Sequence, residues 1–155
     1  MTKLHELGKL GQAIWLDFIR RSFIQAGDLQ ELIEKGVSGV TSNPAIFEKA
    51  IAGSSDYDSD IQRLAGEGKS AEEIYEALAL EDIRQAADLL LPIHVEAGGA
   101  DGYVSIEVSP ALAHNTQGTV AEAQRLFAAV GTPNVMIKIP ATRGNPNIRT
   151  TSRQL

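Results

Sequence analysis

The chain has 155 residues, a net charge of −6 at pH 7 and no cysteine, and 43% of its residues are hydrophobic. These values indicate one ordinary globular domain with a real hydrophobic core, and the lack of cysteine excludes disulfides, thiol catalysis and thiolate metal sites. The acidic balance argues against a nucleic-acid or anionic-membrane partner. No run approaches the roughly 18 apolar residues of a membrane span, and residues 1–16 lack the features of a signal peptide, so we expect a soluble cytoplasmic protein.

The N-terminal part of the chain is predicted to contain two strands. Residues 3–9 are of mixed character and are expected to be a short lead-in, and residues 12–18 are a strand candidate. Residues 19–36 have helical character, and Asp28 is placed to cap the second part of that region. Residues 37–41 form the second predicted strand.

The middle of the chain carries signals for the starts of two helices. Asn43 followed by Pro44 is typical of a helix start, because Asn is a common N-cap and proline fits the first helical turn. Ser70 and Glu73 have capping-box spacing and begin a long helical stretch. Pro92 lies within this stretch and is expected to kink or interrupt it.

The C-terminal part contains the remaining two strand candidates. Residues 103–108 are the third predicted strand, and residues 117–130 have helical periodicity, with Thr116 and Thr119 as candidate caps. Residues 134–139 are the fourth predicted strand. Strands that alternate with helices imply a parallel sheet joined by right-handed crossovers, so the predicted fold class is α/β.

The fourth strand has one unusual residue, Lys138, within an apolar run. Runs of this kind are typical of strands that are buried on both faces of a parallel sheet. Burial of a lysine disfavours its charged form, and the neutral amine is the form that attacks a carbonyl group. A lysine that pairs with a carboxylate, or that reaches water at the end of the strand, is the alternative.

Each predicted strand carries a polar group at or just beyond its C-terminal end. These groups are Asp17, Thr41 with Asn43, Glu107 and Lys138. In (β/α)8 barrels the active site lies at this end of the strands, and neighbouring strands are only about 4.8 Å apart. One lysine, two carboxylates and one amide suit Schiff-base chemistry, although a buried ion cluster that only stabilises the sheet would use the same residue types.

Four sequence blocks in a fixed order carry a resemblance to a known family. They are Trp-Leu-Asp at 15–17, Gly-Val-Thr-Ser-Asn-Pro-Ala-Ile-Phe at 39–47, Val-Ser-Ile-Glu-Val-Ser-Pro at 104–110 and Met-Ile-Lys-Ile-Pro-Ala-Thr at 136–142. Together they closely resemble transaldolase. The resemblance implies a (β/α)8 TIM barrel that transfers a dihydroxyacetone unit between sugar phosphates in the non-oxidative pentose phosphate pathway, with no metal or organic cofactor.

The resemblance also implies a role for each strand-end residue. Lys138 matches the lysine that forms the Schiff base. Asp17 matches the acid/base that handles the proton of the C4 hydroxyl, and Glu107 matches the acid/base that acts through a water while the imine forms and hydrolyses. Thr41 and Asn43 match residues that bind the triose. The implied partners are small-molecule sugar phosphates.

The length of the chain departs from the family pattern. A complete barrel takes about 250 residues, whereas this chain supplies four βα units, which make a partial barrel. We assign residues 1–142 to the N-terminal half of a transaldolase-like barrel. Residues 143–155 lack a helical apolar stripe and are expected to be a divergent, non-native or disordered tail. We therefore expect a fragment with little or no activity, and reading out of frame after Thr142 is one origin of such a tail.

Several alternatives remain open at this point. The unpaired edges of a four-stranded sheet predict self-association. The chain could belong to another lysine-dependent sugar-phosphate aldolase, or be the N-terminal piece of a transaldolase that is fused to a sugar-phosphate isomerase. An alternative of a different class is a non-catalytic half-barrel that serves in binding or assembly. Residues that bind the substrate phosphate are expected to lie beyond this chain.

Overall fold

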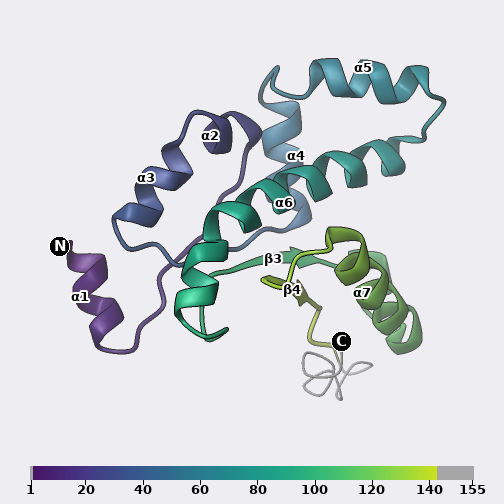
Figure 1. The fold of residues 1–155 in the computed structure, drawn as a ribbon. Helices are drawn as coiled ribbons and strands as arrows, with labels where there is room; N and C mark the ends of the chain where they lie inside the picture. Colours follow the sequence, from purple (N-terminus) through teal and green to yellow (C-terminus); the bar gives the residue numbers. More distant parts are fainter. Residues whose placement is uncertain (1, 143–155) are drawn as a thin grey trace.

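Four parallel strands form one sheet in the computed structural model, which describes residues 2–142 (Figure 1). Strands that are consecutive in the sequence are neighbours in the sheet, in the order β1-β2-β3-β4. This is the strand order of the first half of a (β/α)8 barrel, and it confirms the predicted α/β fold class. The predicted tail at 143–155 lies outside the described residues. The strands are β1 (Trp15–Leu16), β2 (Gly39–Val40), β3 (Tyr103–Glu107) and β4 (Val135–Lys138).

Helices of very different length connect the strands. The longest, α6, crosses over the sheet, and α5 lies well away from it (Figure 1). No helix in residues 2–142 is long and apolar enough to span a membrane. The helices are α1 (Lys3–Lys9), α2 (Arg21–Gln25), α3 (Asp28–Glu34), α4 (Pro44–Ala52), α5 (Asp58–Gly66), α6 (Ala71–Glu96) and α7 (Thr116–Val130), with a 3₁₀ turn at Pro110–Leu112.

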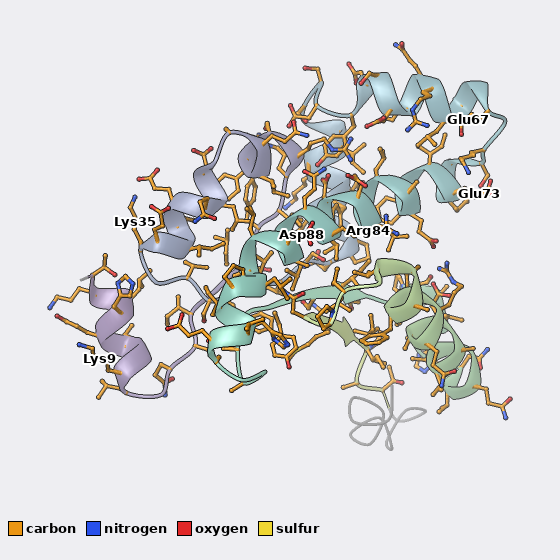
Figure 2. All side chains as sticks on the ribbon, viewed as in Figure 1. Lys9, Lys35, Glu67, Glu73, Arg84 and Asp88 are labelled. Carbon is orange, nitrogen blue, oxygen red and sulfur yellow. The ribbon has the colours of Figure 1, made fainter. Side chains whose placement is uncertain are left out.

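The starts of α4 and α6 agree with the prediction. The side chain of Asn43 caps α4, and Ser70 and Glu73 form the expected capping box at α6. The predicted interruption at Pro92 is wrong, since α6 continues through it. Proline leaves the carbonyl group four residues earlier without a donor. That carbonyl belongs to Asp88, which is exposed like Pro92, so water can bind it (Figure 2).

No helix was predicted at residues 3–9, which were expected to be a short lead-in. The segment forms helix α1, and Thr2 caps it. The Thr2 hydroxyl accepts a hydrogen bond from the backbone N–H of His5, and Nδ1 of His5 accepts one from the backbone N–H of Thr2 at 3.1 Å. Histidine thus takes the place of the Glu or Gln of an ordinary capping box, and the sequence pattern was missed for that reason.

Two other predicted caps are corrected by the structure. Asp28 is the first residue of α3, and the N-cap is Gly27, which has a φ of 89° that favours glycine. The N-cap of α7 is Asn115, whose Oδ1 accepts a hydrogen bond from the N–H of Gly118 at 2.9 Å. Thr116 and Thr119, which were predicted as caps, both lie inside α7.

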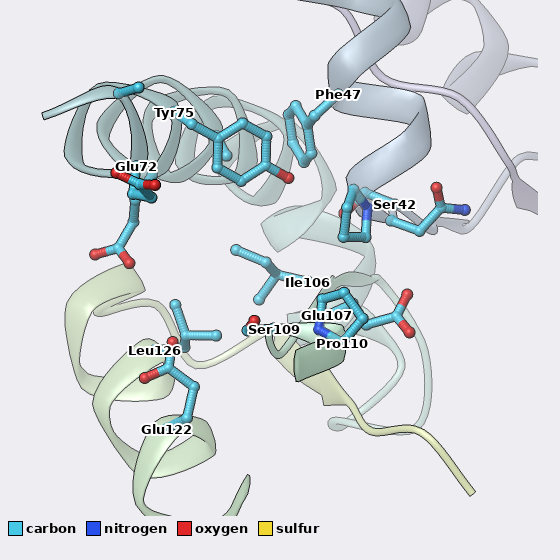
Figure 3. Close-up of a pocket in the computed structure, with 15 residues that line it drawn as sticks. Ser42, Phe47, Glu72, Tyr75, Ile106, Glu107, Ser109, Pro110, Glu122 and Leu126 are labelled. Atoms are coloured by element: carbon cyan, nitrogen blue, oxygen red, sulfur yellow. The ribbon is translucent and has the colours of Figure 1, made fainter. Parts of the chain in front are cut away.

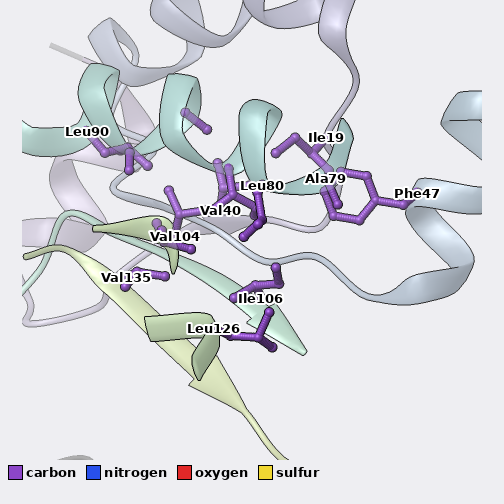
Figure 4. Close-up of a cluster of buried hydrophobic side chains, with 14 of the residues drawn as sticks. Ile19, Val40, Phe47, Ala79, Leu80, Leu90, Val104, Ile106, Leu126 and Val135 are labelled. Atoms are coloured by element: carbon purple, nitrogen blue, oxygen red, sulfur yellow. The ribbon is translucent and has the colours of Figure 1, made fainter. Parts of the chain in front are cut away.

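The core lies between the sheet and its covering helices. Side chains on the lower side of α6 point toward the strands in Figure 4. Successive residues of a strand point to opposite faces, so every second residue of β3 and β4 faces these helices. Each fully buried aliphatic side chain contributes about 1.5–3 kcal/mol relative to its exposed state. Residues of this cluster are Val40, Leu80, Ile83, Leu90, Val104, Ile106, Leu126 and Val135.

The remaining strand residues form a second face, which we call the lysine face. The paired register of β3 and β4 places Ser105 opposite Met136 and Glu107 opposite Lys138, so these four side chains point to the same side. Trp15 of β1 lies on this side as well, because it pairs with Gly39 in the matching register. The lysine face is thus the side of the sheet opposite to the apolar face that α6 and α7 cover.

Trp15, the only tryptophan of the chain, lies directly on Gly39. A Cβ atom built on Gly39 would lie 2.3 Å from Cε2 of the indole ring. Only a residue without a side chain leaves room for the ring at this position. The contact therefore joins β1 to β2 through a flat aromatic surface.

Candidate active site

Lys138 is held between two oxygen atoms at the C-terminal end of the sheet. Its Nζ lies 3.4 Å from Oε2 of Glu107, the residue that pairs with it across β3 and β4. The same Nζ donates a hydrogen bond of 3.4 Å to the backbone carbonyl of Ser42, just after β2. Three adjacent strands therefore contribute to the surroundings of one amine.

The predicted burial of Lys138 is wrong. Its side chain is 43% exposed, and that of Glu107 is 20% exposed. Lys138 is the last residue of β4, an edge strand of the described sheet, and its side chain is on the lysine face rather than on the face that packs against α6 and α7. The alternative of a paired lysine that reaches water at the strand end describes this geometry.

Thr41 and Asn43 lie beside this group, in the segment that joins β2 to α4. Oγ1 of Thr41 accepts a hydrogen bond of 3.0 Å from the hydroxyl of Ser105 on β3. Oδ1 of Asn43 accepts one of 2.9 Å from the backbone N–H of Ile46. The two residues are thus fixed to β3 and to the start of α4, close to the carbonyl that contacts Lys138.

Asp17 is separated from Lys138 by the width of the described sheet. It follows β1 directly and is exposed, whereas Lys138 ends β4 at the opposite edge of the described sheet. Three strand spacings of about 4.8 Å would place the two strands roughly 14 Å apart in a flat sheet. In a closed barrel the strands curl around a common axis, and both residues would face one opening. The catalytic and binding roles of all five residues stay predictions.

A cavity of about 410 Å³ lies next to this site but is not built around the amine. It is lined by parts of α4, α6 and α7 and has an apolar interior that includes Tyr75 and Leu126 (Figure 3). Glu107 lines its edge, but its carboxylate points away from the centre in Figure 3. Burial and the nearby Glu107 carboxylate raise the pKa of Tyr75. The cavity is lined by Glu72, Glu76, Glu107 and Glu122 and by no lysine or arginine, so an anionic sugar phosphate is poorly matched to it.

The most strongly buried charges belong to a cluster in the helical layer. Asp82 of α6 is 0% exposed and accepts hydrogen bonds from Nε of Arg21 at 2.9 Å and from the hydroxyl of Tyr57 at 2.7 Å. Burial raises the pKa of Asp82 although Tyr57 and Arg21 act in the opposite direction. The cluster joins α2, the start of α5 and α6, so we assign it to stability rather than to catalysis.

Sequence reasoning missed two polar residues near the amine, Ser42 and Ser105. Both lie within the sequence blocks 39–47 and 104–110, and the available signal was a small polar residue within the third predicted strand and another just after the second. No group of three or more His, Cys, Asp or Glu side chains within residues 2–142 is arranged to hold a metal ion.

Comparison with known proteins gives a consistent result. The model of the transaldolase/fructose-6-phosphate aldolase family matches residues 14–151. Transaldolase of Trichodesmium erythraeum is 51% identical over 140 residues, which cover 90% of this chain and 37% of that protein. The transaldolases of Neisseria meningitidis serogroup C and Thiobacillus denitrificans are each 49% identical, over 92% of this chain and 40% of their own length. The chain thus spans about two fifths of the length of these curated relatives.

Proposed function

Because the chain belongs to the transaldolase/fructose-6-phosphate aldolase family, we propose that Lys138 forms a Schiff base with a ketose phosphate. The observation that carries the proposal is the placement of one amine within 3.4 Å of the Glu107 carboxylate at the C-terminal end of a parallel sheet. This is the end of the strands at which barrel enzymes bind their substrates. The proposed reaction is transfer of a dihydroxyacetone unit between sugar phosphates, in the non-oxidative pentose phosphate pathway.

Each proposed step uses one of the strand-end residues. The neutral amine of Lys138 adds to the ketone, and the carbinolamine loses water to give the imine while Glu107 moves protons through a water molecule. Asp17 takes the proton of the C4 hydroxyl as the carbon–carbon bond breaks, and the bond electrons move toward the imine nitrogen. The resulting enamine attacks the aldehyde of an acceptor. Hydrolysis of the new imine then releases the product and frees Lys138.

Two features of the site bear on how far this chain could carry out the reaction. Asp17 lies at the opposite edge of the described sheet from Lys138, so the C–C cleavage step needs further strands to close the barrel. Imine formation needs only Lys138 and Glu107, which are already in contact. We therefore propose that this chain forms the covalent adduct more readily than it completes the transfer.

Borohydride trapping with fructose 6-phosphate tests the proposal. We expect reduction to attach the sugar to Lys138, as located by mass spectrometry of its peptide, and we expect no adduct in Lys138→Met. Lys49→Met, which removes an exposed lysine of α4, is the matched control and should keep the adduct. A chain that gives no adduct, or gives it equally at other lysines, would favour the non-catalytic binding module.

Product analysis separates transaldolase from the other lysine-dependent aldolases. A transaldolase passes the dihydroxyacetone unit to an added aldose phosphate, whereas an aldolase releases free dihydroxyacetone without any acceptor. Products are therefore compared with and without an aldose phosphate. Release that does not depend on the acceptor would exclude the transaldolase assignment.

We also propose that chains of these 155 residues associate through the sheet edges. In the described sheet β1 and β4 each have one neighbouring strand, so backbone groups on their outer sides are available to another chain. Met136 on β4 and Phe18 beside β1 add exposed apolar surface. Sedimentation velocity should give species larger than a monomer at micromolar concentration, and a purely monomeric profile would contradict the proposal.

The cytoplasmic location stays a prediction.

A further inference from the structure

The segment that joins β2 to α4 is fixed at each end by hydrogen bonds. The backbone N–H of Thr41 donates to the carbonyl of Leu16 on β1 at 2.8 Å, and its Oγ1 accepts from Ser105 on β3. Asn43 is held by the bond between its Oδ1 and the N–H of Ile46. A backbone segment tied in this way has little freedom to rotate its peptide groups.

Ser42, between these two residues, makes two contacts that point in different directions. Its side chain is fully buried, and its hydroxyl donates a hydrogen bond of 2.7 Å to the carbonyl of Ser105. Its own carbonyl accepts the hydrogen bond of 3.4 Å from Nζ of Lys138. One residue therefore connects the backbone of β3 to the amine on β4.

The two acceptors around the amine limit its orientation. A neutral amine has two N–H groups and one lone pair in a roughly tetrahedral arrangement. One N–H group points to the Ser42 carbonyl, and the Glu107 carboxylate lies 3.4 Å from the same nitrogen as its ion-pair partner, so these two oxygens restrict the directions that the lone pair can take. The lone pair is the part of the amine that attacks a carbonyl carbon, so these acceptors set the direction of attack.

We propose that Ser42 is a positioning residue for the lysine: its buried hydroxyl fixes the carbonyl that orients the amine of Lys138. This inference rests on the proposed Schiff-base function, since it concerns the same lysine. The side chain of Ser42 does not contact the reacting amine; only the backbone carbonyl does. Its hydroxyl acts through the backbone carbonyl, and Ser42→Ala removes the one bond that ties this residue to β3 while the bonds of Thr41 and Asn43 remain.

The first experiment measures the rate of borohydride-trapped adduct formation at Lys138 against the concentration of fructose 6-phosphate. A misplacement of about 1 Å can cost roughly 100-fold in rate, and Lys138 keeps its second partner, so we expect a decrease of about tenfold in Ser42→Ala. The decrease should fall on the limiting rate, with the half-saturating concentration within about twofold of its original value. Ser42→Thr, which retains the hydroxyl, should recover most of the rate.

Thr119→Val is the matched control for the loss of a buried hydroxyl. Thr119 is also fully buried, and its hydroxyl donates a 2.8 Å hydrogen bond to a backbone carbonyl in the same way, but it lies in α7. All rates are expressed per folded molecule, with the folded fraction taken from circular dichroism. Equal rates in Ser42→Ala and Thr119→Val would overturn the proposal, as would a Ser42→Thr variant as slow as Ser42→Ala.

A spectroscopic measurement without sugar separates this proposal from the proposed function. In a chain with isotope-labelled lysine, an oriented Lys138 amine should give two distinct ε-methylene proton shifts, and Ser42→Ala should merge them. Lys49, an exposed lysine of α4, provides the reference and should be unaffected by the substitution. Absence of trapping in the unaltered chain would overturn the Schiff-base function alone. Unchanged Lys138 signals in Ser42→Ala would overturn the positioning role alone.

Discussion

Substitution of Asp82 by Asn should strongly destabilise the fold. The carboxylate of Asp82 is completely buried, and it accepts hydrogen bonds from both Arg21 and Tyr57. The amide of Asn has nearly the same shape but no charge, so it cannot neutralise the guanidinium of Arg21, which is only 7% exposed. The substitution therefore leaves a buried cation without its main counterion.

The size of the effect follows from the partners that remain. Removal of one member of a buried ion pair costs about 3–5 kcal/mol. Arg21 keeps an ion pair with Asp60, whose side chain is 35% exposed, so we expect a loss at the lower end, about 3 kcal/mol. Because a domain of this size is stable by only about 5–15 kcal/mol, such a loss is a large share of the total.

Urea unfolding, followed by circular dichroism, measures this loss. Asp88→Asn is the matched control, because Asp88 lies on the same helix and is exposed (Figure 2). Exposed substitutions of this kind usually change the free energy of unfolding by less than about 0.5 kcal/mol. If Asp82→Asn lowered the free energy of unfolding by no more than Asp88→Asn, the assignment of the buried cluster to stability would be refuted.

Two further predictions concern acid stability and backbone packing. The hydrogen bond from Arg125 holds the pKa of Glu122 below its usual value. The stability that this hydrogen bond provides is therefore complete above the unfolded pKa of about 4.3, and it is lost as the pH falls through the lower folded pKa. Between about pH 6 and pH 3, Glu122→Gln should therefore lose less free energy of unfolding than the unaltered chain, and equal losses in urea titrations would contradict this. Gly102→Ala should cost at least about 2 kcal/mol, because Gly102 has a φ of 79° and the new Cβ would lie 2.3 Å from the backbone nitrogen of His94. Gly68→Ala, at a φ of 81° with no atom within 4 Å, is the control, and an equal shift of both urea midpoints would show that packing contributes nothing.

Local signals in the sequence predicted the starts of α4 and α6 but not those of every helix. The pair Asn43 and Pro44 and the pair Ser70 and Glu73 act within one helical turn, so short-range chemistry decides them. The cap of α1 uses a histidine in the position where acidic or amide residues are usual, and no sequence rule covered that substitution. Local patterns thus locate an element best when its capping residues are the common ones.

Burial of Lys138 and Asp82 could not be inferred correctly from local patterns alone. The run around Lys138 is apolar, but its exposure depends on which segments cover the lysine face, and these are distant in the sequence. Asp82 is a charged residue that is buried. The available signal was that its neighbours Ala79 and Ile83 lie on the apolar stripe of α6. Its partner Arg21 is 61 positions away, so only the structure reveals the pair.

The flat contact between Trp15 and Gly39 gives the chain a built-in optical probe. Since no other tryptophan is present, emission from this ring reports on the first pair of strands, whereas far-ultraviolet dichroism is dominated by the long helices. Denaturation followed with both signals would therefore show whether β1 separates from β2 at a lower denaturant concentration than the helices need to unfold. Two superimposable curves would mean that the β1–β2 pair and the helices unfold in a single cooperative step.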